Sequence, residues 1–319
     1  MSRLSEVVEK INSQAGFTGL IRYDEPMSAH TTFKTGGPAD LWIRPGGDCF
    51  PGYAAELLGA AKAAGIPVFI LGAGANLLVA DRGIRGIVLD TGDWSGWNGP
   101  LVRETEAGEG ACILVRAGTA VDALAEAAAA LGWGGPDFLA GMPGSVGGAV
   151  WMNARCYGHS LSDILLETEI LDESENRVVL PGRAEDFSYK KSPFQGREIL
   201  ILSARFALER RPPAGIRRDI EERRRDRKAK GHYRFPSAGS VFKNDRTFGK
   251  PTGQIIDELG LRGLGLGDAM VAPWHGNIII NRGNARSADV RSLIEEVACR
   301  VKAARGFDLE PELRFVGDW

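Results

Sequence analysis

The sequence predicts an α+β protein. Its length of 319 residues corresponds to about two domains, or three small ones. Short apolar runs of strand length, separated by glycine-rich turns, dominate the first 210 residues. Pro212 and Pro213 then interrupt the chain, and a charged segment with helical character follows. We therefore expect a domain boundary near Arg210, and the sequence shows no internal repeat.

Elements can be assigned in order along the first part of the chain. Residues 5–13 have the pattern of a short amphipathic helix, and the Thr- and Gly-rich residues 31–38 indicate a turn. A strand at 39–44 precedes an Ala- and Leu-rich helix at 51–64, which Gly65 would end as a C-terminal cap. Further apolar strands are expected at 68–71, 77–80, 84–90 and 113–117.

The second part of the chain begins with an alanine-rich helix at 121–131. Residues 138–154 are uncharged but rich in glycine and shorter than the roughly 20 apolar residues of a membrane helix, so they predict a packed loop and strand. A charged helix is expected at 216–230. The remaining elements are strands at 164–172, 177–180, 198–208 and 277–281, and helices at 253–259 and 287–304.

Composition narrows the class of protein. Charged residues make up 25% and hydrophobic residues 44%, as in ordinary soluble globular proteins, and the net charge of -2 argues against a generally basic nucleic-acid binder. The four cysteines form no CxxC pair, so we predict free thiols in a reducing cytosol and no metal site. The polar first 14 residues do not have the pattern of a signal peptide, and we expect a cytoplasmic protein without a membrane span.

Two glycine-rich segments carry the first chemical signal. In Phe69–Val79, glycines at 72 and 74 allow a tight turn whose N–H groups could form a nest for a pyrophosphate. The segment runs from strand to strand and has Leu77 at the sixth position, so it is a poor Rossmann loop, and a plain β-turn is the alternative. Residues 139–154 could lie flat against a planar ring. Two such loops in one strand-rich region favour dinucleotide binding.

These segments, preceded by Phe33-Lys34-Thr35-Gly36-Gly37-Pro38, resemble in order the FAD-binding half of the UDP-N-acetylenolpyruvoylglucosamine reductase family. The resemblance implies a two-lobed FAD-binding module of the vanillyl-alcohol-oxidase type, with lobes at 15–87 and 88–209, and a C-terminal α+β substrate domain at 210–319. It implies non-covalent FAD, because neither loop offers a His or Cys near the pyrophosphate position. The implied cofactor-binding residues are Gly72, Ala73, Gly74, Ala75, Asn76, Gly141, Met142, Pro143, Gly144, Ser145, Gly148 and Asn153.

Three further motifs are similar to the catalytic parts of the same family. Tyr189-Lys190-Lys191-Ser192 resembles a Tyr-Arg-x-Ser motif, and the motif Gly-Ser-x-Phe-Lys-Asn places the family's proton-donating serine at Ser240. The segment Leu-Glu-Pro-Glu-Leu-Arg places its catalytic glutamate at Glu312. The family reaction adds hydride and a proton to an enolpyruvyl ether, with NADPH as reductant. It therefore needs an acid, Ser240, and groups that stabilise negative charge, Lys190 and Glu312.

The resemblance also implies a UDP-sugar substrate, whose diphosphate needs cations. Residues 210–230 contain ten Lys and Arg against four Asp and Glu, although a solvated helix would have the same composition. The substrate-binding candidates are Tyr189, Lys228, Lys230, Asn244 and Arg314. The short stretch between Ser192 and Arg210 suggests the form of the family that lacks an extra tyrosine-bearing loop.

The chain departs from the family pattern at four positions. Lys190 replaces an arginine, and lysine is a point charge where arginine could bind a carboxylate through two donors. Arg155 replaces a glycine close to the expected flavin, Ala75 replaces a serine, and Asp245 replaces a proline. Lys191 could take over the role of Lys190 by a shift of one residue.

Two other functions are compatible with parts of the sequence. One is an FAD oxidoreductase of the same fold acting on a different sugar or alcohol, although such an enzyme would not need both Ser240 and Glu312. The other is a non-enzymatic nucleic-acid binder that uses residues 210–230. Four acids interrupt that segment and no aromatic residue lies in it, which disfavours nucleic acid as a partner.

Overall fold

The computed structural model describes residues 3–14, 17–105 and 108–319, and the chain divides into two compact units. Unit 1 consists of Met1–Arg22, Trp42–Ala73 and Gly86–Arg225, and unit 2 consists of Tyr23–Leu41, Gly74–Arg85 and Asp226–Trp319. Both units are therefore discontinuous in sequence. The elements that pass from one unit into the other are β1 (Gly19–Pro26), β2 (Pro38–Pro45), β5 (Ile84–Asp90) and α5 (Pro213–Ala229).

Unit 1 contains β3 (Val68–Leu71) and parts of β1, β2 and β5, and these strands form a four-stranded sheet of order β1-β2-β5-β3 in which β3 is parallel to β5. The unit also contains α1 (Arg3–Gln14) and α2 (Phe50–Ala64). Helix α2 buries Phe50, Tyr53, Ala54, Leu57 and Ala61, which recur at the spacing of one helix face. As predicted, α2 ends at Gly65, which has the left-handed φ of 67° typical of a C-terminal cap.

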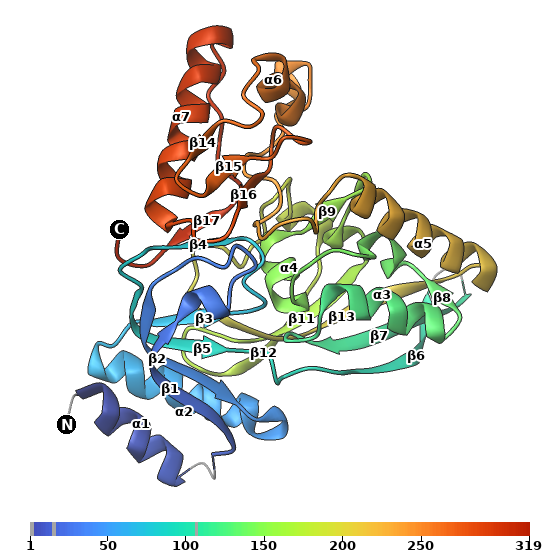
Figure 1. The fold of residues 1–319 in the computed structure, drawn as a ribbon. Coiled ribbons are helices and arrows are strands. Elements are labelled where there is room, and N and C mark those ends of the chain that lie inside the picture. Colours follow the sequence, from blue (N-terminus) through green and yellow to red (C-terminus); the bar gives the residue numbers. More distant parts are fainter. Residues whose placement is uncertain (1–2, 15–16, 106–107) are drawn as a thin grey trace. The chain divides into compact units, whose positions relative to one another are not determined.

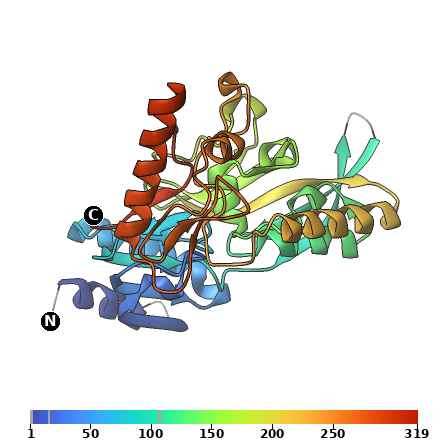
Figure 2. The ribbon, with the colours of Figure 1, turned by 45° about the horizontal axis from the view of Figure 1, so that its top comes forward.

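The second sheet of unit 1 is antiparallel and has the order β12-β11-β13-β7-β6, with β8 also paired to β13. Strand β13 runs beside β7 through the middle of this sheet (Figure 2). Seven of the first nine residues of β13 are buried, on both faces of the strand, as expected when both faces of a sheet are covered. The strands are β6 (Trp97–Thr105), β7 (Gly108–Arg116), β8 (Trp133–Gly134), β11 (Leu165–Leu171), β12 (Arg177–Pro181) and β13 (Leu200–Arg210).

In unit 1, helix α3 (Val121–Ala130) precedes the glycine-rich segment, and α4 (Val146–Met152) lies within it. Alanines of α3 pack against Ile216 and Ile220 of α5 in a small apolar cluster. The prediction of a packed loop and strand for 138–154 is wrong, because this segment contains α4. Ser145 caps the start of α4 and Asn153, in the left-handed region, ends it. A short hairpin follows, formed by β9 (Arg155–Cys156) and β10 (His159–Ser160).

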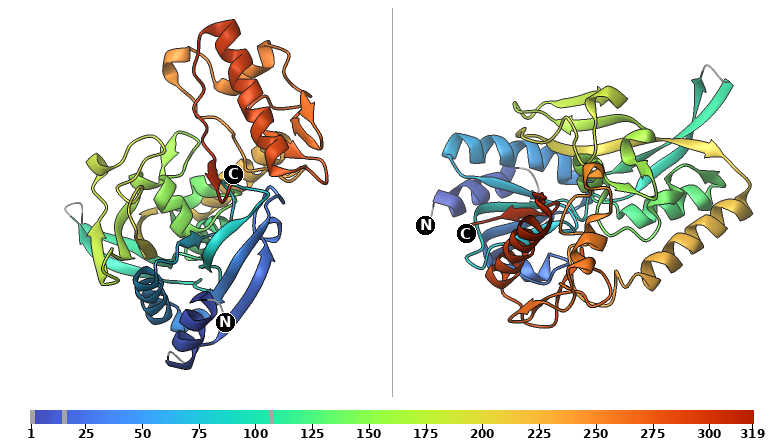
Figure 3. Two further views of the ribbon diagram at one scale, coloured as in Figure 1. Left: turned by 90° about the vertical axis from the view of Figure 1, so that its left-hand side faces the viewer. Right: turned by 90° about the horizontal axis from the view of Figure 1, so that it is seen from above.

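Unit 2 is built on α7 (Ser287–Arg305), which lies along a three-stranded antiparallel sheet (Figure 3). The apolar face of α7 repeats every three or four residues and packs into a core with Phe242, Ile255 and Leu313. The remaining elements are β4 (Leu77–Val79), α6 (Thr252–Glu258), β14 (Gly265–Leu266), β15 (Ala269–Val271), β16 (Ile279–Asn281) and β17 (Arg314–Val316). Strands β4 and β17 pair in parallel (Figure 1).

The predicted α+β class is confirmed by these mixed sheets and helices. The loop between β3 and β4 runs from strand to strand, as the sequence predicted. No helix in the described part of the chain is long and apolar enough to cross a membrane.

Candidate active site

The glycine-rich segment of unit 1 leaves two main-chain donors available. Gly141 donates its N–H to Asp122, and the carbonyl of Gly144 accepts from Val121. By contrast, the N–H groups of Gly144 and Ser145 donate to no other group in the described residues, although Ser145 is only 4% exposed. Because buried N–H groups almost always have a partner, this segment has the character of a ligand cradle.

Gly72 lies directly against this cradle within unit 1. A Cβ atom on Gly72 would lie 2.2 Å from the hydroxyl of Ser145, so any larger residue would displace that hydroxyl. The Ser145 hydroxyl itself accepts a weak hydrogen bond of 3.4 Å from Gly148. The structure therefore brings together the two glycine-rich segments that the sequence singled out.

Lys190 occupies the tip of a tight turn in unit 1. Ser188 and Lys191 exchange both main-chain hydrogen bonds, at 3.2 and 3.0 Å, and enclose Tyr189 and Lys190 between them. Lys190 has a φ of 59°, in the left-handed region that costs a side chain such as lysine roughly 1–2 kcal/mol. Such a φ is uncommon for a residue other than glycine.

Side chains at the end of α4 hold this turn. The buried amide of Asn153 donates to the carbonyl of Ser188 at 3.0 Å and accepts from the N–H of Ser162 at 3.1 Å. Ser192 and Gln195 both donate to the carbonyl of Trp151, at 2.6 and 3.0 Å. The position of the turn is therefore coupled to the end of the helix that follows the cradle.

Arg155 follows the same helix, at the start of the β9–β10 hairpin. Its guanidinium donates to the hydroxyl of Ser160 at 3.3 Å, across the paired strands. The cation introduced at this position thus has a partner within unit 1.

The part of the first glycine-rich loop that lies in unit 2 begins at Gly74 and contacts several other segments. A Cβ on Gly74, whose φ is 61°, would lie 2.1 Å from the carbonyl oxygen of His30, so glycine is required. The hydroxyl of Thr32 donates to Ser237 at 2.7 Å, and the N–H of Thr32 donates to the Gly74 carbonyl at 3.1 Å. The N–H groups of Gly74, Ala75 and Asn76 donate to no group among the residues described, as expected for an anion nest.

The two proposed acids lie on neighbouring extended segments of unit 2. The N–H of Glu312 donates to the carbonyl of Val241 at 2.7 Å, and Phe242 forms an antiparallel bridge with Pro311. On the other side, Ser240 forms an antiparallel bridge with Ile278. Two motifs that are 72 residues apart in the sequence, at Ser240 and Glu312, are thus neighbours in space.

The remaining substrate candidates are placed around these segments. Asn244 follows the Ser240 motif and its side-chain oxygen accepts from the first N–H of α6, that of Thr252, at 2.9 Å. Arg314 starts β17 and is exposed. Tyr189 is 38% exposed. Lys228 is exposed, and Lys230 pairs with Asp226 at 2.7 Å.

Two histidines near these lysines were missed in the sequence analysis. The rings of His232 and His275 are 6.2 Å apart. Burial, assisted by the charge of Arg227, lowers the pKa of His232 to about 4, and burial also lowers the pKa of His275. Both are therefore neutral at pH 7. The chain has only four histidines, and His232 lies eight residues before Ser240 in the sequence. This short separation was the signal that could have identified His232.

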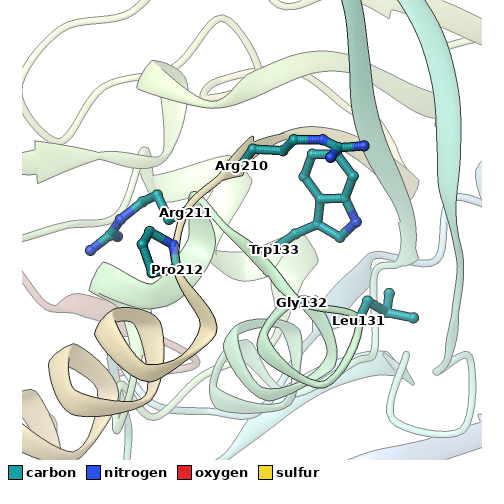
Figure 4. Close-up of a pocket in the computed structure, with 6 residues that line it drawn as sticks. All are labelled: Leu131, Gly132, Trp133, Arg210, Arg211 and Pro212. Atoms are coloured by element: carbon teal, nitrogen blue, oxygen red, sulfur yellow. The ribbon is translucent and has the colours of Figure 1, made fainter.

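A cavity of about 430 Å³ opens at the end of β13 in unit 1. The guanidinium of Arg210 lies 5.1 Å from the ring centre of Trp133, while Arg211 points away from that ring (Figure 4). The lining residues are Leu131, Gly132, Trp133, Arg210, Arg211 and Pro212, and none is a predicted site residue. In the described chain, no group of three or more His, Cys, Asp or Glu residues could hold a metal ion.

The fold and the donor-lined cradle define an FAD-dependent oxidoreductase. Residues 53–180 match the family described as FAD binding domain, and residues 231–316 match the C-terminal domain of UDP-N-acetylenolpyruvoylglucosamine reductase. The chain belongs to the UDP-N-acetylenolpyruvoylglucosamine reductase family. It is 39% identical to the reductase of Treponema denticola, over 94% of this chain and 95% of that protein. It is 36% identical to that of Borreliella burgdorferi, over 98% of each.

Solved structures agree with this assignment. The crystal structure of the reductase from Thermus caldophilus is similar with a TM-score of 0.73 and 31% identity. The similarity covers 94% of this chain and 99% of that one. The predicted family and FAD-binding fold are therefore confirmed.

Proposed function

We propose that this protein reduces the enolpyruvyl ether of UDP-N-acetylglucosamine to UDP-N-acetylmuramate, using non-covalent FAD and taking its electrons from NADPH. The names of its relatives support the substrate class. The reaction would take place in the cytoplasm, as a step in the synthesis of peptidoglycan precursors. The observation that carries the proposal is the hydrogen bond from Glu312 to Val241, which brings the acid segments together.

The free main-chain donors fit FAD. The N–H groups of Gly74, Ala75 and Asn76 would bind the pyrophosphate, while those of Gly144 and Ser145 would bind oxygen atoms of the cofactor. Because Ser145 is buried, leaving its N–H without a partner would cost roughly 1–3 kcal/mol. Asn153 would act by fixing the end of α4, since its amide already binds two protein groups.

Bound FAD would supply the hydride that the methylene carbon of the enolpyruvyl group receives. Ser240 would then donate a proton to the neighbouring carbon, and the C=C bond becomes a CH–CH₃ unit. Negative charge that develops on the substrate carboxylate would be stabilised by the ammonium group of Lys190 and by a hydrogen bond from protonated Glu312. The roles of Ser240 and Glu312 require that both residues be held rigidly. The main-chain hydrogen bond between Glu312 and Val241 would hold Glu312 and the segment of Ser240 in place.

The UDP diphosphate would bind near the start of the C-terminal segment. Lys228 and Lys230 supply positive charge there, and the neutral His232 and His275 can each donate one N–H without adding charge. Tyr189, Asn244 and Arg314 would contact other parts of the substrate. We assign the chain to the form without the extra tyrosine loop, because only seven residues separate Ser192 from the start of β13 at Leu200.

The proposal can be tested by measuring the two half-reactions separately: reduction of the flavin by NADPH and its reoxidation by the UDP-sugar. The purified protein should show a flavin spectrum that NADPH bleaches without oxygen and that the enolpyruvyl UDP-sugar then restores. Ser240→Ala should bleach normally but be restored at least about 100-fold more slowly, because general acid catalysis contributes that much. Ser237→Ala, three residues before Ser240, is the matched control and should behave as the unaltered protein.

Other outcomes separate the parts of the proposal. A flavin that bleaches but is not restored by this sugar would contradict the substrate and favour another flavin oxidoreductase of the same fold. Normal restoration in Ser240→Ala would contradict the role of Ser240. A protein that takes up no FAD would contradict the proposed function as a whole.

A further inference from the structure

A buried amide lies next to the proposed proton donor in unit 2. Asn277 is only 3% exposed, and its side chain makes two hydrogen bonds to one residue, Phe242. The side-chain oxygen accepts from the N–H of Phe242 at 2.9 Å, and the side-chain nitrogen donates to the carbonyl of Phe242 at 2.8 Å. Phe242 is two residues beyond Ser240.

The segment from Ser240 to Phe242 needs this amide because it belongs to no regular strand. It makes only isolated bridges, so a neighbouring strand does not satisfy all of its main-chain groups. Phe242 is 1% exposed, and buried main-chain groups without partners are costly. The amide of Asn277 presents one acceptor and one donor side by side, as a paired strand would.

The same residue holds the segment through its backbone. The carbonyl of Asn277 accepts from the N–H of Val241 at 2.9 Å, and the carbonyl of Val241 accepts from the N–H of Glu312 at 2.7 Å. The N–H of Asn277 donates to the ring of His275 at 3.1 Å, which fixes Asn277 in turn. The segment that carries Ser240 is thus held by hydrogen bonds to both Asn277 and Glu312.

We propose that Asn277 is a positioning residue that keeps Ser240 at the place where it can deliver a proton. This inference rests on the proposed function, in which Ser240 is the acid. Asn277 would not touch the substrate but would fix the backbone two residues from the hydroxyl. Displacement of a reacting group by about 1 Å lowers rates by roughly 100-fold, so loss of this anchor should mainly affect the protonation step.

The first test uses Asn277→Leu, which keeps the side-chain volume but removes both hydrogen bonds. Bleaching by NADPH and the dissociation constant of the UDP-sugar should change by less than about 2-fold. Restoration of the flavin by the sugar should slow by roughly 10- to 100-fold. Hydrogen exchange of the amides at 241–243 should become faster in the variant, which measures the anchor without any activity.

Leu293→Ala is the matched control for stability. Leu293 is buried in the same core, on α7, and its truncation destabilises the fold without removing a hydrogen bond to the Ser240 segment. Its restoration rate and the exchange at 241–243 should stay near those of the unaltered protein at a temperature well below unfolding. Equal slowing in both variants would overturn the inference, because general destabilisation would then explain it.

Asn277→Asp gives a sharper readout through pH. A protonated carboxyl group offers one donor and one acceptor, as the amide does, whereas an ionised one offers only acceptors. Relative to the unaltered protein at the same pH, this variant should be slow at high pH and recover as the pH falls. A pH-independent defect in Asn277→Asp, or a rate of flavin reoxidation in Asn277→Leu within 2-fold of normal, would overturn this inference but not the proposed function. If the unaltered protein is not restored by the sugar, the proposed function fails, and this role fails with it.

Discussion

The side-chain amide of Asn76 donates a hydrogen bond of 3.1 Å to the main-chain carbonyl of Glu312. The main-chain carbonyl of Asn76 in turn accepts from the N–H of Arg314 at 2.9 Å, where β17 begins to pair with β4. One residue of the proposed pyrophosphate loop therefore holds the segment that carries the proposed catalytic glutamate. Within unit 2, Asn76 thus joins the proposed cofactor loop to the segment of Glu312 through both its side chain and its main chain.

This link predicts a double effect for Asn76→Ala. Loss of the hydrogen bond should lower the free energy of unfolding by about 1 kcal/mol. Because Glu312 would lose one support, restoration of the flavin by the UDP-sugar should slow by roughly 10-fold. Stopped-flow absorbance measures the rate, and Asn176→Ala, on the exposed turn between β11 and β12, is the control. A normal rate in Asn76→Ala would show that Glu312 does not depend on this link.

The contact between Gly72 and Ser145 predicts a rescue experiment. Gly72→Ala should weaken FAD binding by at least about 10-fold, because the new methyl group would meet the Ser145 hydroxyl at 2.2 Å and push the two segments apart. Adding Ser145→Ala should recover part of the lost affinity, since that oxygen is then absent. Fluorescence titration with FAD measures both. Failure of the second change to improve binding, with Ser145→Ala itself near normal, would contradict the contact.

Lys190 should show opposite effects on stability and activity. Lys190→Gly relieves the strain of a positive φ, so the free energy of unfolding should stay equal or rise by about 0.5 kcal/mol. Reoxidation of the flavin should nevertheless slow by at least about 10-fold, because the cation proposed to face the substrate carboxylate is lost. Urea unfolding and stopped-flow absorbance test the two parts.

Lys191→Gly provides the comparison for this prediction. Lys191 is exposed and its φ is not positive, so glycine should destabilise slightly and leave the rate unchanged. If the rate falls in Lys191→Gly but not in Lys190→Gly, the carboxylate cation is Lys191, and the assignment moves by one residue.

The sequence allowed the class, most elements and the two glycine-rich loops to be predicted, because these depend on local patterns. Helix α4 was missed, since Gly147 and Gly148 have poor helix propensity. Its position is set by a distant contact: the N–H of Gly147 donates to the carbonyl of Ala117, and a Cβ on Gly147 would meet the Ala117 side chain at 2.9 Å. Ser145 as a cap and Asn153 as a left-handed end were local signals that could have identified it.

The candidate site also has a part that local motifs predict and a part that depends on contacts between distant segments. Ser240 and Glu312 were recognisable from their motifs, but their proximity depends on pairing between segments 72 residues apart. The role of Asn277 could not be predicted, because an asparagine in an apolar strand looks like any buried amide until its partner, Phe242, is known. Tertiary hydrogen bonds of this kind leave no periodic pattern in the sequence.

His232 makes stability depend on pH in a defined window. Its usual pKa is 6.5, and burial together with Arg227 lowers the pKa to about 4 in the folded protein. As the pH falls below 6.5, the unfolded chain takes up a proton that the folded protein refuses until about pH 4. The free energy of unfolding should therefore be unaffected above pH 6.5 and fall between pH 6.5 and 4.

His232→Gln should remove this contribution, because glutamine is neutral throughout. Allowing for the partial exposure of the ring, we expect the unaltered protein to lose about 1–2 kcal/mol more than the variant between pH 7 and 4.5. Urea unfolding at several pH values measures the difference, and comparison of the two proteins cancels the carboxylates that titrate in the same range. His275 remains in the variant, so part of the slope should persist. A difference of zero, or a variant that loses more stability than the unaltered protein, would show that His232 is not held neutral by the fold.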